Sequence, residues 1–217
     1  MRAKSATRAS DGLTLIELLI VIAVLALLAA FLLPAPISRK ANAARIHCVS
    51  NLKQVGLGFH LWANNNDGKF PWMLPIKQYG TLEYAAAGEA WRHFAVAADE
   101  LNSAKILRCP DDKEKITASA WTNFSNANLS YFVGLQSSMT NPVSLLSGDR
   151  NLTVNDVALQ PGLTLLSTNV APGYTTDLHK RCGNLGLGDG SVMQVTPALL
   201  YAQLIAGGTN QIRLVIP

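Results

Sequence analysis

Glu17 places a carboxylate inside an almost uninterrupted apolar run that extends from Leu13 to Leu33. A charged side chain at membrane depth costs on the order of 2.5–3.5 kcal/mol, so such a residue predicts a function and a cationic partner. No basic residue follows Glu17 within two helical turns. A chain cut after Gly12 would carry a new α-amino group on Leu13, and this amine could neutralise Glu17 of a neighbouring copy. The residues therefore predict charge pairing between apolar helices.

A second group of polar residues lies near the C-terminus, where His179 is followed by nine residues and then Asp189-Gly190. Asp177 and Asp189, together with loop carbonyls, could offer oxygen ligands to calcium. Histidine is a poor calcium ligand, and the spacing of an EF-hand is absent. The structural alternative is that Asp189-Gly190 forms a turn and that His179 hydrogen-bonds a loop. We favour this alternative and predict no cofactor, with calcium left open.

The three cysteines, Cys48, Cys109 and Cys182, show no CxxC spacing. Outside the cytoplasm they would allow one disulfide and one free thiol, and the sequence leaves all three pairings open. A zinc site built from these cysteines and His179 has the right ligand types, but their spacing is scattered.

Composition and motifs narrow the class of function. Charged residues make up 15% of the chain, and half of its +4 net charge lies in residues 1–12. The remainder is too weakly basic to predict a nucleic-acid partner. The sequence contains no GxSxG, HExxH or phosphate-binding glycine loop that leads into a helix. We therefore predict that the protein is not an enzyme.

The apolar run itself predicts a membrane-spanning helix. Its 21 residues would form about 32 Å of helix, close to the thickness of the hydrocarbon layer. The basic residues before it place the N-terminus in the cytoplasm. Pro34 and Pro36 predict a kink or a short break after the run.

The segment Gly12-Leu13-Thr14-Leu15-Ile16-Glu17 resembles the processing motif of type IV pilins and type II secretion pseudopilins. The resemblance implies that prepilin peptidase cuts between Gly12 and Leu13 and methylates the amine of Leu13. It also implies that Glu17 guides assembly and that Pro34 kinks the helix. Two differences from the usual motif are Leu13, where the family mostly has phenylalanine, and Asp11 before the glycine.

Other pieces resemble a subfamily of prepilin-like proteins with a His-x9-Asp-Gly motif. These pieces are Asn51–Leu57, Cys109-Pro110-Asp111, Ser130-Tyr131 and the arrangement of His179 with Asp189-Gly190. The resemblance implies a pilin-like fold, in which a long N-terminal helix packs on a small antiparallel sheet.

The pattern of residues predicts the same α+β architecture. A second helix should carry one apolar stripe, because apolar residues recur three and four positions apart from Ala41 to Trp62. Residues 89–101 and 197–206 should form helices, and residues 129–135, 144–147, 185–195 and 212–216 should form strands, the third a hairpin. The predicted segments are a leader at 1–12, a transmembrane and assembly helix at 13–34, a stalk helix at 35–66 and a globular extracytoplasmic domain at 67–217.

These observations predict a pseudopilin or a minor-pilin-like structural subunit. Its partners would be prepilin peptidase, other pilin or pseudopilin subunits, an inner-membrane assembly platform and, before assembly, membrane lipid. It would cross the bacterial inner membrane once, with its C-terminal domain in the periplasm, and would enter a filament of a type II secretion or type IV pilus-like system. The alternative is a membrane-tethered extracytoplasmic binding module that uses the leader for sorting alone.

Overall fold

The computed structural model describes residues 14–32, 36–208 and 210–217, and its account of side chains leaves out residues 30–41. The predicted cleavage site at Gly12 and Leu13 and the predicted kink at Pro34 lie outside the described residues. The chain divides into two units, Met1–Arg39 and Lys40–Pro217, and each is described by itself.

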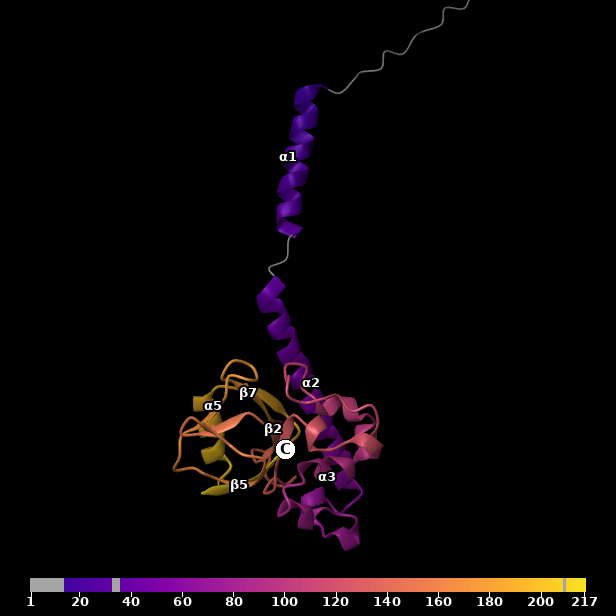
Figure 1. The fold of residues 1–217 in the computed structure, drawn as a ribbon, viewed down its shortest axis with the longest axis vertical. Helices are drawn as coiled ribbons and strands as arrows, with labels where there is room; N and C mark the ends of the chain where they lie inside the picture. The colour runs from indigo at the N-terminus through magenta and orange to yellow at the C-terminus, as the bar shows by residue number, and fades with distance from the viewer. Residues whose placement is uncertain (1–13, 33–35, 209) are drawn as a thin grey trace, which may run out of the picture. The chain divides into compact units, whose positions relative to one another are not determined.

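The first unit contains helix α1, Leu15–Leu32, drawn in indigo in Figure 1. Apolar residues occupy every side of α1, and Glu17 is its one acidic residue, in the first turn. Among the described residues, no helix meets the combined length and hydropathy expected of a membrane span. Leu13, Leu33 and Pro34 of the predicted span are not described, so the span stays a prediction.

Helix α2, Pro36–Asn64, carries the predicted apolar stripe into the second unit. The stripe is buried at Cys48, Leu52, Val55, Phe59 and Trp62. The helix ends where the sequence predicts, because Asp67 and Gly68 adopt positive φ angles of 54° and 71°. The amide of Gly68 then donates back to the carbonyl of Ala63 at 2.9 Å.

Short helical segments follow α2 and precede the strands. They are η1 Pro71–Met73, η2 Ile76–Gln78, η3 Leu82–Ala85, α3 Ala90–Ala95, α4 Ala98–Leu101, η4 Ala104–Leu107, η5 Trp121–Asn123 and η6 Asn126–Asn128. The single helix predicted for residues 89–101 is thus wrong, since it is divided into α3 and α4. The division follows from a tight turn in which the amide of Ala97 donates to Phe94, three residues back, at 3.1 Å.

Among the described residues of the second unit, nine strands and one further helix follow. They are β1 Tyr131–Gly134, β2 Leu145–Asp149, β3 Leu152–Val154, β4 Val157–Ala158, β5 Gly162–Ser167, β6 Pro172–Tyr174, β7 Gly183–Leu187, β8 Val192–Val195, α5 Pro197–Ala206 and β9 Gln211–Ile216. Six strands form an antiparallel sheet in the order β5-β9-β1-β2-β7-β8, and β4-β3-β6 form a smaller antiparallel sheet. The predicted α+β class with an antiparallel sheet is confirmed.

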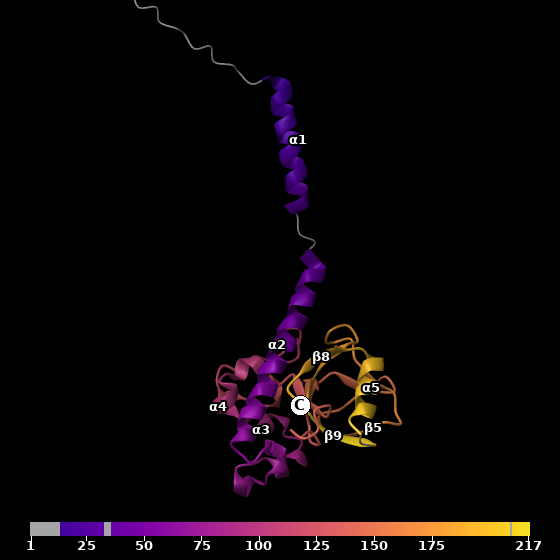
Figure 2. The ribbon, with the colours of Figure 1, turned by 180° about the vertical axis from the view of Figure 1, so that it is seen from behind.

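The six-stranded sheet has a core on each face. Successive residues of a strand point to opposite faces, so Tyr131 and Val133 join the core that contains the α2 stripe. Phe132, between them, joins the other core with Leu200 and Leu204 of α5. Figures 1 and 2 show the strands and α5 on one side of the unit and α3 on the other, with α2 running past both.

Candidate functional site

The N-terminal candidate site is built on the first turn of α1. The carboxylate oxygen Oε2 of Glu17 accepts hydrogen bonds from the backbone amide of Thr14 at 2.8 Å and from its hydroxyl at 2.7 Å. The amide of Glu17 donates to the same hydroxyl at 3.4 Å. This is the reciprocal arrangement of a capping box, which satisfies backbone donors that a helix start leaves free. Both bonds to the carboxylate end on Oε2, so the described residues offer Oε1 no donor.

The side chains of α1 that the structure describes, as far as Ala29, are exposed. The large apolar side chains among them are between 49% and 78% exposed. These side chains are Leu15, Ile16, Leu18, Leu19, Ile20, Val21, Ile22, Val24, Leu25, Leu27 and Leu28. A helix that is apolar on every side is normally covered by lipid or by other helices. The exposed surface of α1 is therefore of the kind that lipid or other helices cover.

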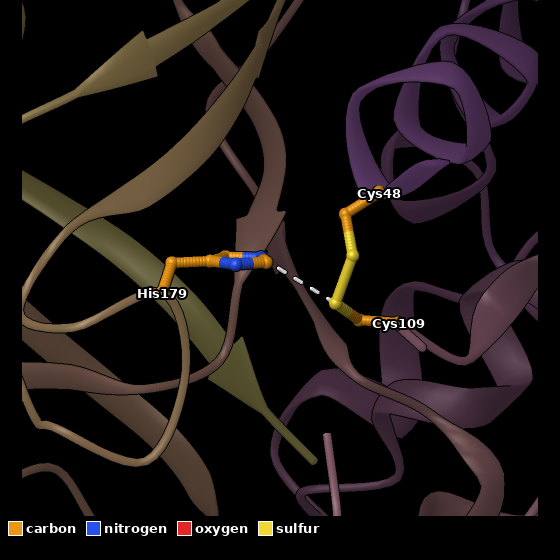
Figure 3. A group of neighbouring side chains, drawn as sticks. All are labelled: Cys48, Cys109 and His179. Carbon is orange, nitrogen blue, oxygen red and sulfur yellow. Dashed lines mark hydrogen bonds between the residues drawn. A yellow bond between two sulfur atoms is a disulfide. The ribbon is translucent and has the colours of Figure 1, made fainter. Parts of the chain in front are cut away.

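The second candidate site surrounds a disulfide between Cys48 and Cys109, whose Cα atoms are 5.2 Å apart (Figure 3). Cys48 comes from α2 and Cys109 follows η4, and both are fully buried. The ring of His179 faces this bond, with Nε2 at 3.4 Å from the sulfur of Cys109. Cys182 carries a free, partly exposed thiol. The structure thus selects one of the three pairings that the sequence leaves open.

Two carboxylates hold the His179 ring from either side. Its Nδ1 lies 3.2 Å from Oδ2 of Asp111, and its backbone amide donates to the same oxygen. Its Nε2 lies 3.5 Å from Oδ2 of Asp149, a fully buried residue at the end of β2. Asp149 also accepts two hydrogen bonds from Asn184, at 2.7 and 2.9 Å.

Burial sets the charge of this pair. It raises the pKa of Asp149 to about 7, although the hydrogen bonds from Asn184 and the charge of Arg45 oppose the rise. It lowers the pKa of His179, against the attraction of Asp111. Both shifts favour the neutral form of each group. Near neutral pH the imidazole of His179 is therefore largely neutral, and the carboxyl group of Asp149 is partly protonated.

The backbone around His179 is strained. His179, Lys180 and Arg181 have φ angles of 50°, 54° and 63°, which makes three consecutive left-handed residues without a glycine. Each such residue costs about 1–2 kcal/mol. The contacts of the His179 ring stabilise the turn, and Asn151 adds hydrogen bonds to the carbonyls of Thr175 and Leu178.

Asp189-Gly190, at the other end of the His-x9-Asp-Gly motif, forms the turn between β7 and β8. This is the turn that the sequence predicts as the alternative to a calcium site. The carboxylate of Asp189 accepts from the amide of Ser191 at 2.8 Å, and Gly190 adopts a φ of 81°. This turn lies against α2, because a Cβ added to Gly56 would lie 3.3 Å from the Cα of Gly190.

One end of the motif therefore packs on α2, and the other reaches this helix through Cys109 and its disulfide to Cys48. Cys48 and Gly56 are eight residues apart, which is about 12 Å along α2. Strand β7, Gly183–Leu187, lies between His179 and Asp189. We infer that the nine-residue spacing of the motif places one end of this strand beside the disulfide and the other against α2. Asn51 joins this arrangement through a hydrogen bond from its side-chain amide to the carbonyl of Arg108 at 3.3 Å.

The proposed calcium ligands have separate roles. The carboxylate of Asp177 accepts from the hydroxyl of Thr175 at 2.7 Å, and that of Asp189 closes its own turn. Within the described part of the chain, the one group of three or more histidine, cysteine or acidic side chains that could share an ion is Cys48, Cys109 and His179. Their ligand atoms lie within 4.8 Å of one another.

The comparison with protein families bears on the N-terminal site. Residues 7–33 match the prokaryotic N-terminal methylation motif. The match confirms the predicted motif and is consistent with the prepilin motif of type IV pilins and pseudopilins. Residues 34–217 lie outside the match. Neither a curated protein nor a solved structure matches the chain significantly.

The prepilin-type motif indicates the broad role of the chain. It implies processing by prepilin peptidase and assembly with other pilin subunits, and it indicates a structural subunit. It also indicates a protein that is first anchored in the membrane and then assembled into a filament.

Sequence reasoning missed two contributors to these sites. Thr14 carries a recognisable signal, because Thr14-x-x-Glu17 has the spacing of a capping box. Asp149 carries none, since an aspartate at the end of a short strand gives no sign of burial. Asp111 was included in the Cys109-Pro110-Asp111 piece, but its contact with His179 follows from the fold alone.

Proposed function

We propose that the protein is a pseudopilin or a minor-pilin-like subunit of a type II secretion or type IV pilus-like filament. The observation that supports this most directly is the exposed apolar surface of α1 behind a prepilin-type motif. Before assembly, lipid of the inner membrane covers that surface, with the N-terminus in the cytoplasm and the C-terminal domain in the periplasm. After assembly, helices of other subunits cover it.

Glu17 directs the change from lipid to filament. Prepilin peptidase cuts between Gly12 and Leu13 and methylates the new amine of Leu13. This amine is the cation that pairs with Glu17 of a neighbouring subunit. The capping box supports the pairing, because Thr14 orients the carboxylate through Oε2 and leaves Oε1 for the neighbour.

Intact mass and N-terminal sequencing of the chain from its native membrane test the processing step. We expect a mature chain that begins at methylated Leu13. A chain that retains residues 1–12 would overturn the proposal and would favour a tethered binding module.

Three variants separate the charge of Glu17 from its capping role. Glu17→Gln keeps an acceptor for Thr14 but removes the charge, whereas Thr14→Ala removes the hydroxyl half of the capping box and keeps the charge. We expect Glu17→Gln and Glu17→Ala to insert into the membrane and to be absent from sheared filaments. Thr14→Ala should still assemble. Normal incorporation of Glu17→Gln would show that the charge has no role in assembly.

A further inference from the structure

A cavity of about 360 Å³ opens beside α3, in the part of the second unit that lies away from α5 (Figure 1). Ligand-binding pockets usually have volumes of about 300–1,000 Å³. The walls of this cavity come from α3 and from the segment that contains η2 and η3. The lining residues belong neither to the prepilin-type motif nor to the group around the disulfide. The cavity is therefore a separate candidate site.

Three aromatic side chains line this cavity, and an arginine braces two of them. The rings are those of Tyr79, Tyr84 and Trp91. The guanidinium carbon of Arg92 lies 4.3 Å from the ring centre of Tyr84 and 4.5 Å from that of Trp91. Its Nε also donates to the carboxylate of Glu89 at 2.7 Å. Because these side chains are already ordered, they lose little further conformational entropy when a ligand binds.

The third ring, that of Tyr79, is held out in solvent by its backbone. Tyr79 is 84% exposed and has a left-handed φ of 60°, which is uncommon for a bulky residue. Its amide donates to the carbonyl of Ile76 at 3.0 Å. The next residue is Gly80, where an added Cβ would clash with the carbonyl of Leu74. An exposed aromatic ring on a strained but well-fixed turn is a feature that occurs at ligand-binding sites.

The polar atoms of the aromatic side chains and of Arg92 can donate hydrogen bonds into the cavity. Within the described residues, no hydrogen bond occupies the hydroxyls of Tyr79 and Tyr84 or the indole N–H of Trp91. Arg92 uses its Nε alone, so both of its Nη atoms are available. Indole and guanidinium groups only donate, whereas a phenol can donate or accept. The cavity thus combines aromatic surface with an excess of donors.

We propose that this cavity binds a proline-rich segment of a partner protein in the polyproline II conformation. Such a segment presents apolar rings and solvated carbonyl acceptors, and its prolines have no N–H. Its rings would pack on the aromatic side chains, and its carbonyls would accept from the indole, the hydroxyls and the guanidinium. Aromatic-lined grooves recognise such segments repeatedly, because the bound conformation is already formed in the free peptide. The proposal does not depend on the function of α1.

Other classes of ligand fit the lining less well. An ammonium ion is attracted to aromatic faces, but Arg92 already stacks on the rings of Tyr84 and Trp91 and repels a second cation. The hydroxyls of a saccharide need acceptors as well as donors. The two nearby carboxylates, Glu83 and Glu89, do not line the cavity. The balance of donors and acceptors therefore favours a ligand with many acceptors and few donors.

Fluorescence polarisation with the detergent-solubilised full chain tests the proposal. The probe is labelled decaproline, and the control is a labelled glycine–serine peptide of the same length, which behaves as a flexible coil. We expect saturable binding of one decaproline per chain, displacement by unlabelled decaproline and no binding of the control peptide. Binding of neither peptide, or equal binding of both, would overturn the proposal. Binding of soluble glycan fragments in place of decaproline would assign the cavity to saccharides and would also overturn it.

Variants locate the site on the chain. Tyr79→Asn removes the exposed ring, and asparagine tolerates the left-handed backbone, so the fold should be kept. This variant should bind decaproline at least about tenfold more weakly. Trp91→Phe keeps a ring but removes the N–H donor, and binding should weaken by about 2–10-fold.

Tyr201→Ala is the matched control. Tyr201 is a 41% exposed tyrosine on α5, it does not line this cavity, and its loss should leave the affinity for decaproline unchanged. Unchanged binding in both Tyr79→Asn and Trp91→Phe would overturn the assignment to this cavity. A loss in Tyr201→Ala as large as that in Tyr79→Asn would overturn it as well.

Discussion

Helix α1 and the second half of α2 are both rich in apolar residues, but those of α1 are exposed and those of the α2 stripe are buried. The large apolar side chains of α1 from Leu15 to Leu28 are at least 49% exposed, whereas Cys48, Val55 and Phe59 of α2 are fully buried. The difference follows from their patterns. Apolar residues lie on every side of α1, while those of α2 form one stripe that a single domain can cover. The comparison shows that the stripe of α2 is covered within its own unit, whereas the apolar surface of α1 is not covered within its unit.

The same contrast separates two carboxylates. Glu17 is exposed and is held by the cap of its own helix, with one oxygen free among the described residues. Asp149 is fully buried beside His179 and keeps one oxygen unpartnered. In the exposed helix the free oxygen supports an intermolecular role, whereas in the core the unpartnered oxygen belongs to a carboxyl group whose pKa burial raises to about 7.

The largest effect should come from Phe59→Ala in the α2 stripe. Phe59 lies 5.1 Å from the ring of Trp72 and 5.3 Å from that of Phe94, and it is fully buried. Its truncation should lower the free energy of unfolding by about 3–5 kcal/mol. Urea titration of the full chain in mild detergent measures this loss. Tryptophan fluorescence is a suitable probe, because all four tryptophans lie in the second unit.

Two controls sharpen the comparison. Leu57→Ala removes a side chain that is 59% exposed on the same helix, and Ile20→Ala removes one that is 58% exposed on α1. Neither should move the unfolding transition by more than about 0.5 kcal/mol. A large loss in Ile20→Ala would show that α1 contributes to the core of its own chain, and the contrast between the two helices would fail.

Much of this architecture was predictable where the residue pattern is periodic. The α2 stripe, its end at Gly68, α5 and the hairpin of β7 and β8 all follow from local signals. Four strands between Leu152 and Tyr174 gave no such signal. β4 has two exposed residues, β5 begins at a glycine and exposes Leu163 and Leu165, and β6 contains a proline and a glycine. β5 forms by pairing with the distant β9, whereas β3 pairs with β4 and β6, and intrinsic strand propensity does not encode these pairings.

The sites divide in the same way. Glu17 was predictable, because a charge in an apolar run is conspicuous in the sequence itself. The group at Cys48, Cys109 and His179 joins residues up to 131 positions apart, and only the fold brings them together. The residue types of this group mark its members as candidates in the sequence, but the sequence does not predict that they lie close together.

The next effect is a loss of stability in acid that arises from His93 in the second unit. His93 is fully buried, accepts or donates one hydrogen bond with Thr81 at 2.7 Å and lies edge-on to Trp72. Burial lowers its pKa to about 4, from an ordinary value near 6.5. The unfolded chain therefore gains a proton at a higher pH than the folded chain. The stabilising contribution is complete above pH 6.5 and is lost as the pH falls toward 4.

His93→Gln tests this assignment, because glutamine can keep a bond to Thr81 but does not titrate. Between pH 7 and pH 4.5 the unaltered chain should lose on the order of 2 kcal/mol more unfolding free energy than the variant. Urea titrations at both pH values measure the difference. Parallel losses in the two proteins would assign the acid sensitivity to other groups. Burial acts to raise the pKa of Asp112, but hydrogen bonds and the charge of Arg150 lower it below its ordinary value. Asp112 therefore titrates mainly below this pH range.

The smallest effect should come from Gly190→Ala, at the turn where the His-x9-Asp-Gly motif meets α2. Gly190 has a φ of 81°, a conformation that costs a residue with a Cβ about 1–2 kcal/mol. Gly207→Ala is the matched control, because Gly207 has a right-handed φ of −63° and an added Cβ would meet nothing closer than 3.5 Å. That control should leave the unfolding free energy unchanged within about 0.5 kcal/mol. Equal effects of the two substitutions would mean that the turn is free to rearrange. The Asp-Gly pair would then not hold β7 against α2, and His179 alone would explain the motif.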